Sequence, residues 1–260
     1  MNRIGLSSAC FYPLPTEDSF GRLCSLGFKT AEIFMNSPSE LEEDFLDGLV
    51  KERDRYGVEV VSLHPFGSFV ESYSLFSSYP RRFTDYMPLY RKFFHACERL
   101  GAKIFIIHGA KIPGTVDDDE YCERFVKLID EGEKYGVTVA HENVVHYRCE
   151  SPDYMLMMRN KIGERFRTVI DNKQALRAGY SPYEFIEKLA PSIIHVHVSD
   201  NGDAGDCIPP GEGVFDFKKY FDTYDDIGYT GKFIIELYRH SFAEDSQLTA
   251  ARTYLEGILN

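Results

Sequence analysis

Acidic and imidazole side chains recur directly after short apolar segments of this 260-residue chain. Each segment has the composition of a buried strand, and the carboxyl ends of parallel strands share one rim. In chain order the polar residues are His64, His108, Glu142, Asp171, His197 and Glu236. Carboxylates brought together repel one another and raise one another's pKa, and a divalent cation relieves that conflict. The pattern therefore predicts a metal centre.

The predicted metal ligands are Glu142, Asp171, His197 and Glu236. Three carboxylates and one imidazole suit Mn²⁺, Mg²⁺ or Co²⁺ and also accept Zn²⁺. His64 and His108 would add a second, nitrogen-rich metal site or contact the substrate.

Strand alternation separates these residues from their neighbours. His195 and His197 share one face of the same strand, and His197 is the better ligand because it lies nearer the carboxyl end. We expect His195 to pack deeper. His141 and Glu142 point in opposite directions, and we assign Glu142 inward and His141 to an outward structural role.

The segments that must position these residues alternate in type. The expected strands are Ile4–Ser7, Thr30–Phe34, Val58–Leu63, Ile104–Ile107, Val137–Ala140, Phe166–Ile170, Ile193–Val198 and Phe233–Leu237. The expected helices are Glu40–Tyr56, Asp85–Leu100, Asp118–Tyr135, Asp216–Ile227 and Glu244–Leu259. Several polar helical stretches end at a glycine that is followed by the next apolar run, as at Gly57 and Gly101.

Eight strands in 260 residues give ~32 residues per unit, which predicts a single (β/α)₈ TIM barrel over residues 1–260. A doubly wound open sheet is the alternative, but the chain has no G-x-G-x-x-G or Walker-type loop. The segment 66–82 is the longest irregular stretch, and we expect it to form a loop over the site.

The composition limits the classes of partner and the cellular compartment that we expect for this protein. The chain has 29 Lys and Arg against 41 Asp and Glu, so its formal charge of −12 disfavours nucleic acid. No apolar run approaches the ~18 residues of a membrane span. The first twelve residues do not resemble a signal peptide, and the six cysteines form no C-x-x-C pair, so we expect a cytoplasmic protein with reduced thiols. Whether it forms a homo-oligomer stays open.

The same residues resemble the xylose isomerase-like TIM-barrel superfamily, which includes sugar isomerases, sugar epimerases and endonuclease IV-type repair enzymes. The resemblance covers essentially the whole chain. It rests on His64, His108, the runs 141–143, 171–174 and 195–200, the loop 209–213, and the pair Ile235-Glu236.

The resemblance implies that the metal is held by Glu142, Asp171, His197 and Glu236. It also implies that Glu142 and Glu236 act as the acid/base pair. The metal would polarise a ketose carbonyl and stabilise an enediolate while one glutamate removes a proton and the other returns one. The expected activity is isomerisation or epimerisation of a sugar, a sugar phosphate or a hydroxy-keto acid.

Two departures argue against the endonuclease branch. Its third metal site requires a His where this chain has Gln174, and an Asp-x-His where it has Asp206-Cys207-Ile208. Gln174 also departs from many epimerases, which place a substrate-contacting His there. A lyase or dehydratase acting on a polyol-derived ketone, a repair-type phosphodiesterase and a non-catalytic binding protein remain the alternatives.

Four residues are predicted to contact the substrate. They are Lys173, Gln174, Glu212 and Arg239. Lys173 and Arg239 would hold a phosphate or carboxylate, Gln174 would bond a hydroxyl group, and Glu212 would reach the ligand from the loop 206–213. Phe11, Tyr12, Phe66 and Phe69 could form an aromatic wall for the sugar, but aromatic residues at the starts of loops more often only pack against the core.

Overall fold

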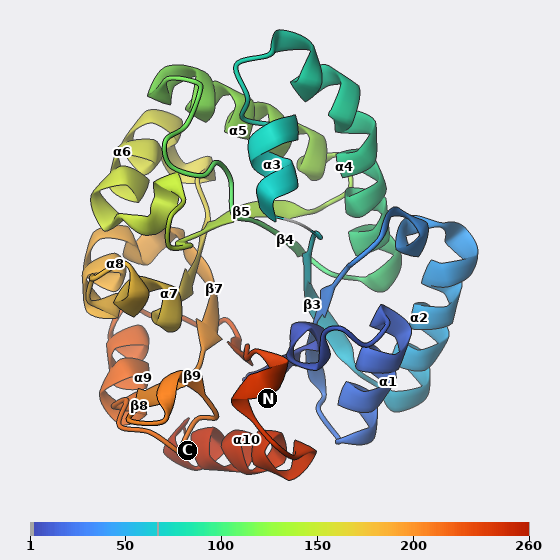
Figure 1. Ribbon diagram of the computed structural model, residues 1–260, viewed down its shortest axis with the longest axis vertical. Coiled ribbons are helices and arrows are strands. Elements are labelled where there is room, and N and C mark those ends of the chain that lie inside the picture. The colour runs from blue at the N-terminus through green and yellow to red at the C-terminus, as the bar shows by residue number, and fades with distance from the viewer. Residues whose placement is uncertain (1–2, 67, 260) are drawn as a thin grey trace.

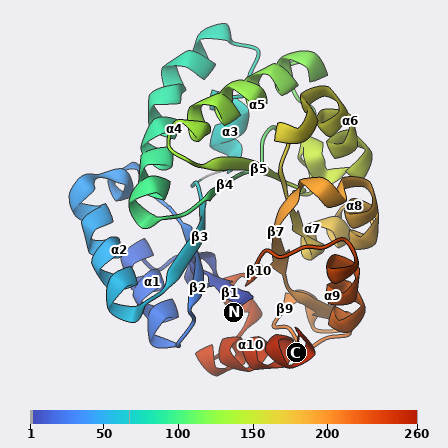
Figure 2. The same cartoon turned by 180° about the vertical axis from the view of Figure 1, so that it is seen from behind.

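Eight parallel strands close into a barrel surrounded by helices in the computed structural model, which describes residues 3–66 and 68–259 (Figure 1, Figure 2). The strands are β1 (Ile4–Ser7), β2 (Thr30–Phe34), β3 (Glu59–His64), β4 (Ile104–Ile107), β5 (Thr138–Glu142), β6 (Thr168–Asp171), β7 (Ile193–Val198) and β10 (Phe233–Ile235). Each strand pairs with its neighbours in chain order, and β10 closes the ring onto β1. The predicted TIM barrel is confirmed.

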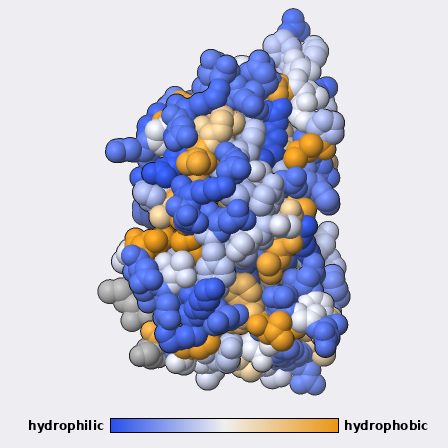
Figure 3. Space-filling model, turned by 90° about the vertical axis from the view of Figure 1, so that its left-hand side faces the viewer, coloured by the Kyte–Doolittle hydropathy of each residue, from blue (hydrophilic) through white to orange (hydrophobic). Residues whose placement is uncertain are grey.

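The helices lie outside this ring, apart from two short helices, α3 (Ser68–Ser74) and α7 (Asn172–Arg177), which lie near the carboxyl ends of the strands (Figure 1). They are α1 (Thr16–Ser25), α2 (Glu43–Tyr56), α3 (Ser68–Ser74), α4 (Pro80–Leu100), α5 (Asp118–Glu133), α6 (Pro152–Ile162), α7 (Asn172–Arg177), α8 (Pro182–Leu189), α9 (Phe217–Asp226) and α10 (Asp245–Leu259). The face over α6 and α8 is mainly hydrophilic with small, separate hydrophobic patches, as expected for the outer side of amphipathic helices (Figure 3).

Glycines end two of the longest helices in the left-handed conformation. Gly57 follows α2 with φ of 58°, and Gly101 follows α4 with φ of 79°. This conformation costs little without a Cβ atom, so each helix stops there and the next strand begins within three residues. The glycine-then-strand pattern of the sequence is therefore confirmed at both positions.

Strand alternation divides the apolar residues into two cores. The large core fills the space between the strands and the helices, where Phe105 of β4 packs against Phe93 and Phe94 of α4. A small second core inside the barrel contains Ile106, Ala140 and Val169. Two residues further along each of these strands, the inward position is polar, and these positions build the site.

Three parts of the sequence-based assignment were wrong or incomplete. The segment 66–82 is not irregular, because it contains α3 and the first residues of α4; Gly67 lies outside the described residues. Helix α4 begins at Pro80, where proline fits the first helical turn. The loop 206–213 is partly strand, because β8 (Asp200–Gly202) and β9 (Gly205–Ile208) form an antiparallel hairpin.

The helices α1, α6, α7 and α8 were not predicted. In the described residues, no helix is both long enough and apolar enough to cross a membrane. All six cysteines are buried and free, as expected for reduced thiols.

Truncating Phe105 tests the core between barrel and helices. Phe105 is fully buried, so Phe105→Ala should lower the free energy of unfolding by about 3–5 kcal/mol through lost burial and an unfilled cavity. Urea denaturation measures the change. Val214→Ala is the control, because Val214 is 79% exposed and its truncation should change stability by less than about 0.5 kcal/mol. Equal stability of both variants would contradict this packing.

Candidate metal centre

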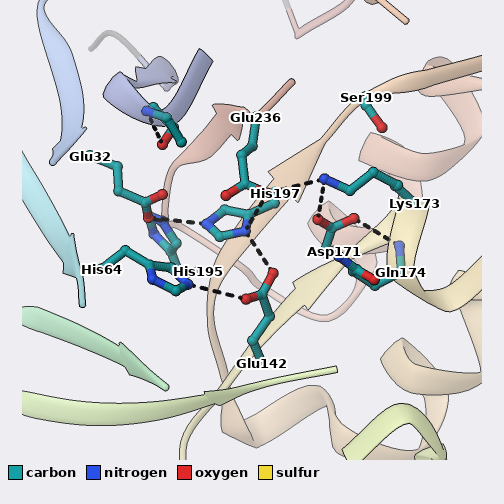
Figure 4. Close-up of polar contacts among 12 residues, drawn as sticks. Glu32, His64, Glu142, Asp171, Lys173, Gln174, His195, His197, Ser199 and Glu236 are labelled. Atoms are coloured by element: carbon teal, nitrogen blue, oxygen red, sulfur yellow. Dashed lines mark hydrogen bonds and ion pairs between the residues drawn. The ribbon is translucent and has the colours of Figure 1, made fainter. Parts of the chain in front are cut away.

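The inward residues at the carboxyl ends of the strands form one buried cluster (Figure 4). Glu142 ends β5, Asp171 ends β6, His197 lies in β7 and Glu236 follows β10. One ligand atom from each of these four residues lies within 4.8 Å of the other three. The His197 Nδ1 atom is 3.0 Å from Glu142 Oε1 and 3.6 Å from Glu236 Oε2. The structure therefore brings together the four predicted ligands.

His64 and His108 form a second group with Glu142. The Nε2 atoms of the two histidines are 2.7 Å apart, and the Glu142 Oε2 atom is 2.9 Å from His108 Nε2 and 3.5 Å from His64 Nε2. Glu142 thus turns one carboxylate oxygen toward each group of ligand atoms. This arrangement keeps both sequence-based interpretations of the histidines open, as ligands of a second metal or as substrate contacts.

The donor atoms at this position suit a cation. Glu142 Oε2 and Asp171 Oδ2 are buried and accept no hydrogen bond from the described residues; their close neighbours are the imidazole of His108 and the ammonium group of Lys173. Buried carboxylate oxygens without hydrogen bonds are costly, and coordination of a divalent ion would satisfy them. The residues present therefore fit a divalent metal ion.

Electrostatics keep the glutamates of this cluster ionised. Burial alone would raise the pKa of Glu142, but His197 and His108 hold it well below its usual range. Burial is likewise outweighed at Glu236, whose pKa is lowered by Lys173 and His197. His197 has a pKa raised well above its ordinary value, because Glu32, Glu236 and Glu142 surround it and outweigh the effect of burial. Both glutamates are therefore ionised at neutral pH, as a general base must be.

Glu32 is a member of the site whose role the sequence did not reveal. From the interior face of β2, its Oε2 atom accepts hydrogen bonds from His197 Nε2 at 3.0 Å, His195 Nε2 at 3.1 Å and Ser62 Oγ at 2.7 Å. A proton on His197 Nε2 leaves the Nδ1 atom facing Glu142 and Glu236. Such outer carboxylates orient metal-binding histidines. The signal was a glutamate inside the apolar run Thr30–Phe34.

Glu71 supports the site from α3, which lies over the β4–β5 part of the barrel (Figure 1). Its Oε2 atom accepts hydrogen bonds from the backbone N–H groups of His108 and Gly109, and its side chain is buried. Burial raises the pKa of Glu71 to about 8. The sequence did not identify Glu71 as a site residue, because it belongs to the stretch interpreted as a loop.

Lys173 and Gln174 lie where the sequence predicted, beside the cluster. The Lys173 Nζ atom is 3.1 Å from both Asp171 Oδ2 and Glu236 Oε2. The Gln174 side chain accepts a hydrogen bond from the Val145 backbone N–H. Both residues line a pocket of about 530 Å³ that also exposes Glu142 and Glu236.

Glu212 and Arg239 do not line this pocket, and their contacts with a substrate stay predictions. Glu212 is exposed and accepts hydrogen bonds from Gln247 Nε2, because its loop folds back onto Asp200. The Arg239 guanidinium turns toward Phe242, donating to the Phe242 carbonyl at 2.8 Å and lying over the Phe242 ring.

Two neighbouring histidines occupy the positions that alternation predicted. His141 points outward, where its Nε2 atom lies 2.7 Å from Tyr121 Oη of α5, and His195 is buried in the barrel beside Glu32. Of the predicted aromatic wall, Tyr12, Phe66 and Phe69 line the pocket. Phe11 does not, because it is fully buried in the outer core.

The fold and the cluster define a barrel with its functional groups at the carboxyl ends of the strands. The chain belongs to the xylose isomerase-like TIM barrel family, whose model matches residues 20–258. A relative is an uncharacterised protein of Methanocaldococcus jannaschii, 26% identical over 90% of this chain and 83% of its own. Another is an inosose isomerase of Bacillus licheniformis, 27% identical over 62% of this chain and 64% of its own.

Solved structures agree with this fold. A D-tagatose 3-epimerase-like protein has a TM-score of 0.82 at 23% identity and covers 99% of this chain and 97% of its own. The IOLI protein with a binding zinc atom has a TM-score of 0.76 at 16% identity and covers 99% of this chain and 96% of its own. At these identities the two structures establish the fold.

Removing the charge of Glu32 tests how His197 is oriented. Glu32→Gln should weaken metal binding about 10–100-fold, because His197 loses its anionic partner. Titration calorimetry with Mn²⁺ measures the affinity. Ser62→Ala is the matched control, since it removes another hydrogen bond to the same Glu32 oxygen and leaves His197 paired. Unchanged affinity in Glu32→Gln would contradict an orienting role.

The pKa of Asp171 predicts a pH dependence of metal binding. Burial raises this pKa to about 6 despite the nearby Lys173. Because a protonated carboxyl group is a poor ligand, Mn²⁺ affinity should fall about tenfold for each unit below pH 6. Calorimetry between pH 5 and pH 8 provides the measurement, and Asp171→Asn should bind weakly throughout. An affinity independent of pH across this range would show that Asp171 is not a ligand.

Proposed function

We propose that this protein is a divalent-metal-dependent isomerase or epimerase of a sugar or a related hydroxyketone. The observation that carries the proposal is the placement of two ionised glutamates, Glu142 and Glu236, at the border of one pocket and both facing the Nδ1 atom of His197. The relatives support it, because they include an inosose isomerase and a D-tagatose 3-epimerase-like protein.

The two glutamates suit the removal and return of a proton. In either order, one carboxylate takes the proton from the carbon next to the carbonyl. The other carboxylate must first gain a proton from water, and the resulting carboxyl group then gives that proton to the carbon. A divalent ion held by Glu142, Asp171, His197 and Glu236 would polarise the carbonyl oxygen and stabilise the developing negative charge.

Neighbouring residues support this chemistry without taking part in the proton transfer. Lys173 holds Glu236 in place through its ammonium group, and Glu32 fixes the ring of His197. Gln174 lines the pocket and offers an amide that can hydrogen-bond a hydroxyl group but cannot exchange a proton with it.

Hydrogen exchange tests this proposal. Metal-loaded protein in D₂O should introduce deuterium at the carbon next to the carbonyl of a ketose or hydroxy-keto acid. Glu142→Gln and Glu236→Gln should each slow the exchange about 10²–10⁴-fold, because an amide cannot accept the proton. Mass spectrometry or proton NMR measures the rate.

Glu212→Gln is the matched control, since Glu212 is an exposed glutamate outside the pocket and should leave the rate unchanged. Absence of exchange with a broad panel of ketoses and keto acids, in protein saturated with Mn²⁺, would contradict the proposed function. Loss of water from the substrate without epimer or isomer formation would instead identify a dehydratase.

A further inference from the structure

The pocket above the cluster has one polar side and an extensive apolar wall. The wall is formed by Tyr12, Phe34, Phe66, Phe69, Val70 and Leu237. Tyr12 is 60% exposed and Phe69 is 67% exposed, so much aromatic surface stands in water. A pocket of about 530 Å³ falls within the ~300–1,000 Å³ range of sites for drug-sized ligands. A small polyol alone would leave much of this apolar wall exposed to solvent.

The cationic side chains near the pocket are already paired. Among the described residues that line the pocket, the one cation apart from two histidines is Lys173, which bridges Asp171 and Glu236. Arg177 lies beside Tyr238, which lines the pocket, and donates hydrogen bonds to the carboxylate of Asp206 through its Nε and Nη2 atoms. No guanidinium in the described wall is therefore available to bind a phosphate or carboxylate.

The backbone donors of the glycine-containing loop are engaged as well. TIM barrels often bind phosphate with the loops that follow the seventh and eighth strands. Here the N–H groups of Gly211 and Gly213 donate to Asp200 Oδ2 at 2.9 and 3.1 Å, and that of Phe215 donates to Asp200 Oδ1 at 2.9 Å. The buried Asp200 carboxylate thus occupies the place that a bound anion would take.

The balance of charges around the pocket also disfavours an anionic substituent on the substrate. One divalent ion together with Lys173 would balance the three carboxylates of Glu142, Asp171 and Glu236. A His197 that binds this ion through Nδ1 is neutral, so the carboxylate of Glu32 adds a further negative charge. No net positive charge remains for an anionic substituent, whose desolvation in this pocket would be uncompensated.

We infer that the substrate is an uncharged hydroxyketone bearing an apolar substituent, most simply an aromatic ring, that packs against the wall of Phe66, Phe69 and Tyr12. Phosphorylated and acidic sugars are disfavoured. This inference rests on the proposed function, which gives the hydroxyketone. The paired cations indicate that the substrate is uncharged, and the apolar wall indicates an apolar substituent.

Three compounds with one shared ring separate these alternatives: 3-keto-D-glucose, its phenyl β-glycoside and its 6-phosphate. With Mn²⁺-loaded protein, kcat/KM for deuterium incorporation should be at least about tenfold higher for the phenyl glycoside than for the free sugar, since burying an aromatic ring contributes about 10–100-fold. The value for the phosphate should be at least about tenfold lower than that for the free sugar.

Phe69→Ala should remove most of the preference for the phenyl glycoside, because Phe69 belongs to the wall. Tyr73→Ala is the matched control on the same helix, since Tyr73 lies against Tyr86 and Arg82 and outside the wall, and it should keep the preference. Equal loss in both variants would attribute the preference to the stability of α3 and overturn the assignment of the wall.

The outcomes distinguish this inference from the proposed function. Exchange that is equal for the three compounds, or fastest for the phosphate, overturns the inference and leaves the isomerase proposal standing. If none of the three exchanges, calorimetry with the same compounds provides the ranking. Tighter binding of the phenyl glycoside supports the inference, and its failure to bind overturns it. The wider exchange panel separately decides the proposed function.

Discussion

Mutual repulsion of buried carboxylates is the constraint that organises this protein. Glu32, Glu142, Asp171 and Glu236 all lie at or inside the mouth of the barrel, where burial opposes ionisation. His197 offsets this repulsion by contacting the three glutamates. Lys173 offsets it by its ion pair with Asp171. A divalent ion among Glu142, Asp171, His197 and Glu236 would complete this compensation.

The same constraint explains the arrangement of the strands. Inside the barrel, a layer that includes Ile106, Ala140 and Val169 forms a dry floor. Alternation then places Glu142 and Asp171 above two of these residues on the same strands, and His108, directly after β4, above Ile106. The floor keeps water from the lower side of the site, so that charges there interact strongly. The pocket leaves the opposite side open to a ligand.

The barrel and the four central residues could be predicted because they depend on local patterns. Apolar runs after glycine caps locate the strands. Because inward positions recur at every second residue of a strand, the apolar run also indicates which residue at its end points inward. The convergence of Glu142, Asp171, His197 and Glu236 then follows from closure of the barrel. Helix α4 was placed too late because its first turn, around Pro80, has little apolar periodicity.

Residues whose position depends on non-local contacts were not predictable. Helix α3 is held by Glu71 hydrogen-bonding the backbone of His108, a contact between residues 37 positions apart. Glu212 was expected in the site from its charge and its loop, yet this loop folds back onto Asp200. The direction of Arg239 depends instead on a local partner, the Phe242 carbonyl three residues further along the chain. A single sequence contains no signal for such competing hydrogen-bond partners.

Crystals of the protein soaked in Mn²⁺ offer the most direct test, through the anomalous scattering of the metal. We expect one strong anomalous peak within bonding distance of Glu142, Asp171, His197 and Glu236 at low Mn²⁺ concentration. A peak confined to the space between His64 and His108, or no peak in this barrel mouth at saturating Mn²⁺, would contradict this expectation.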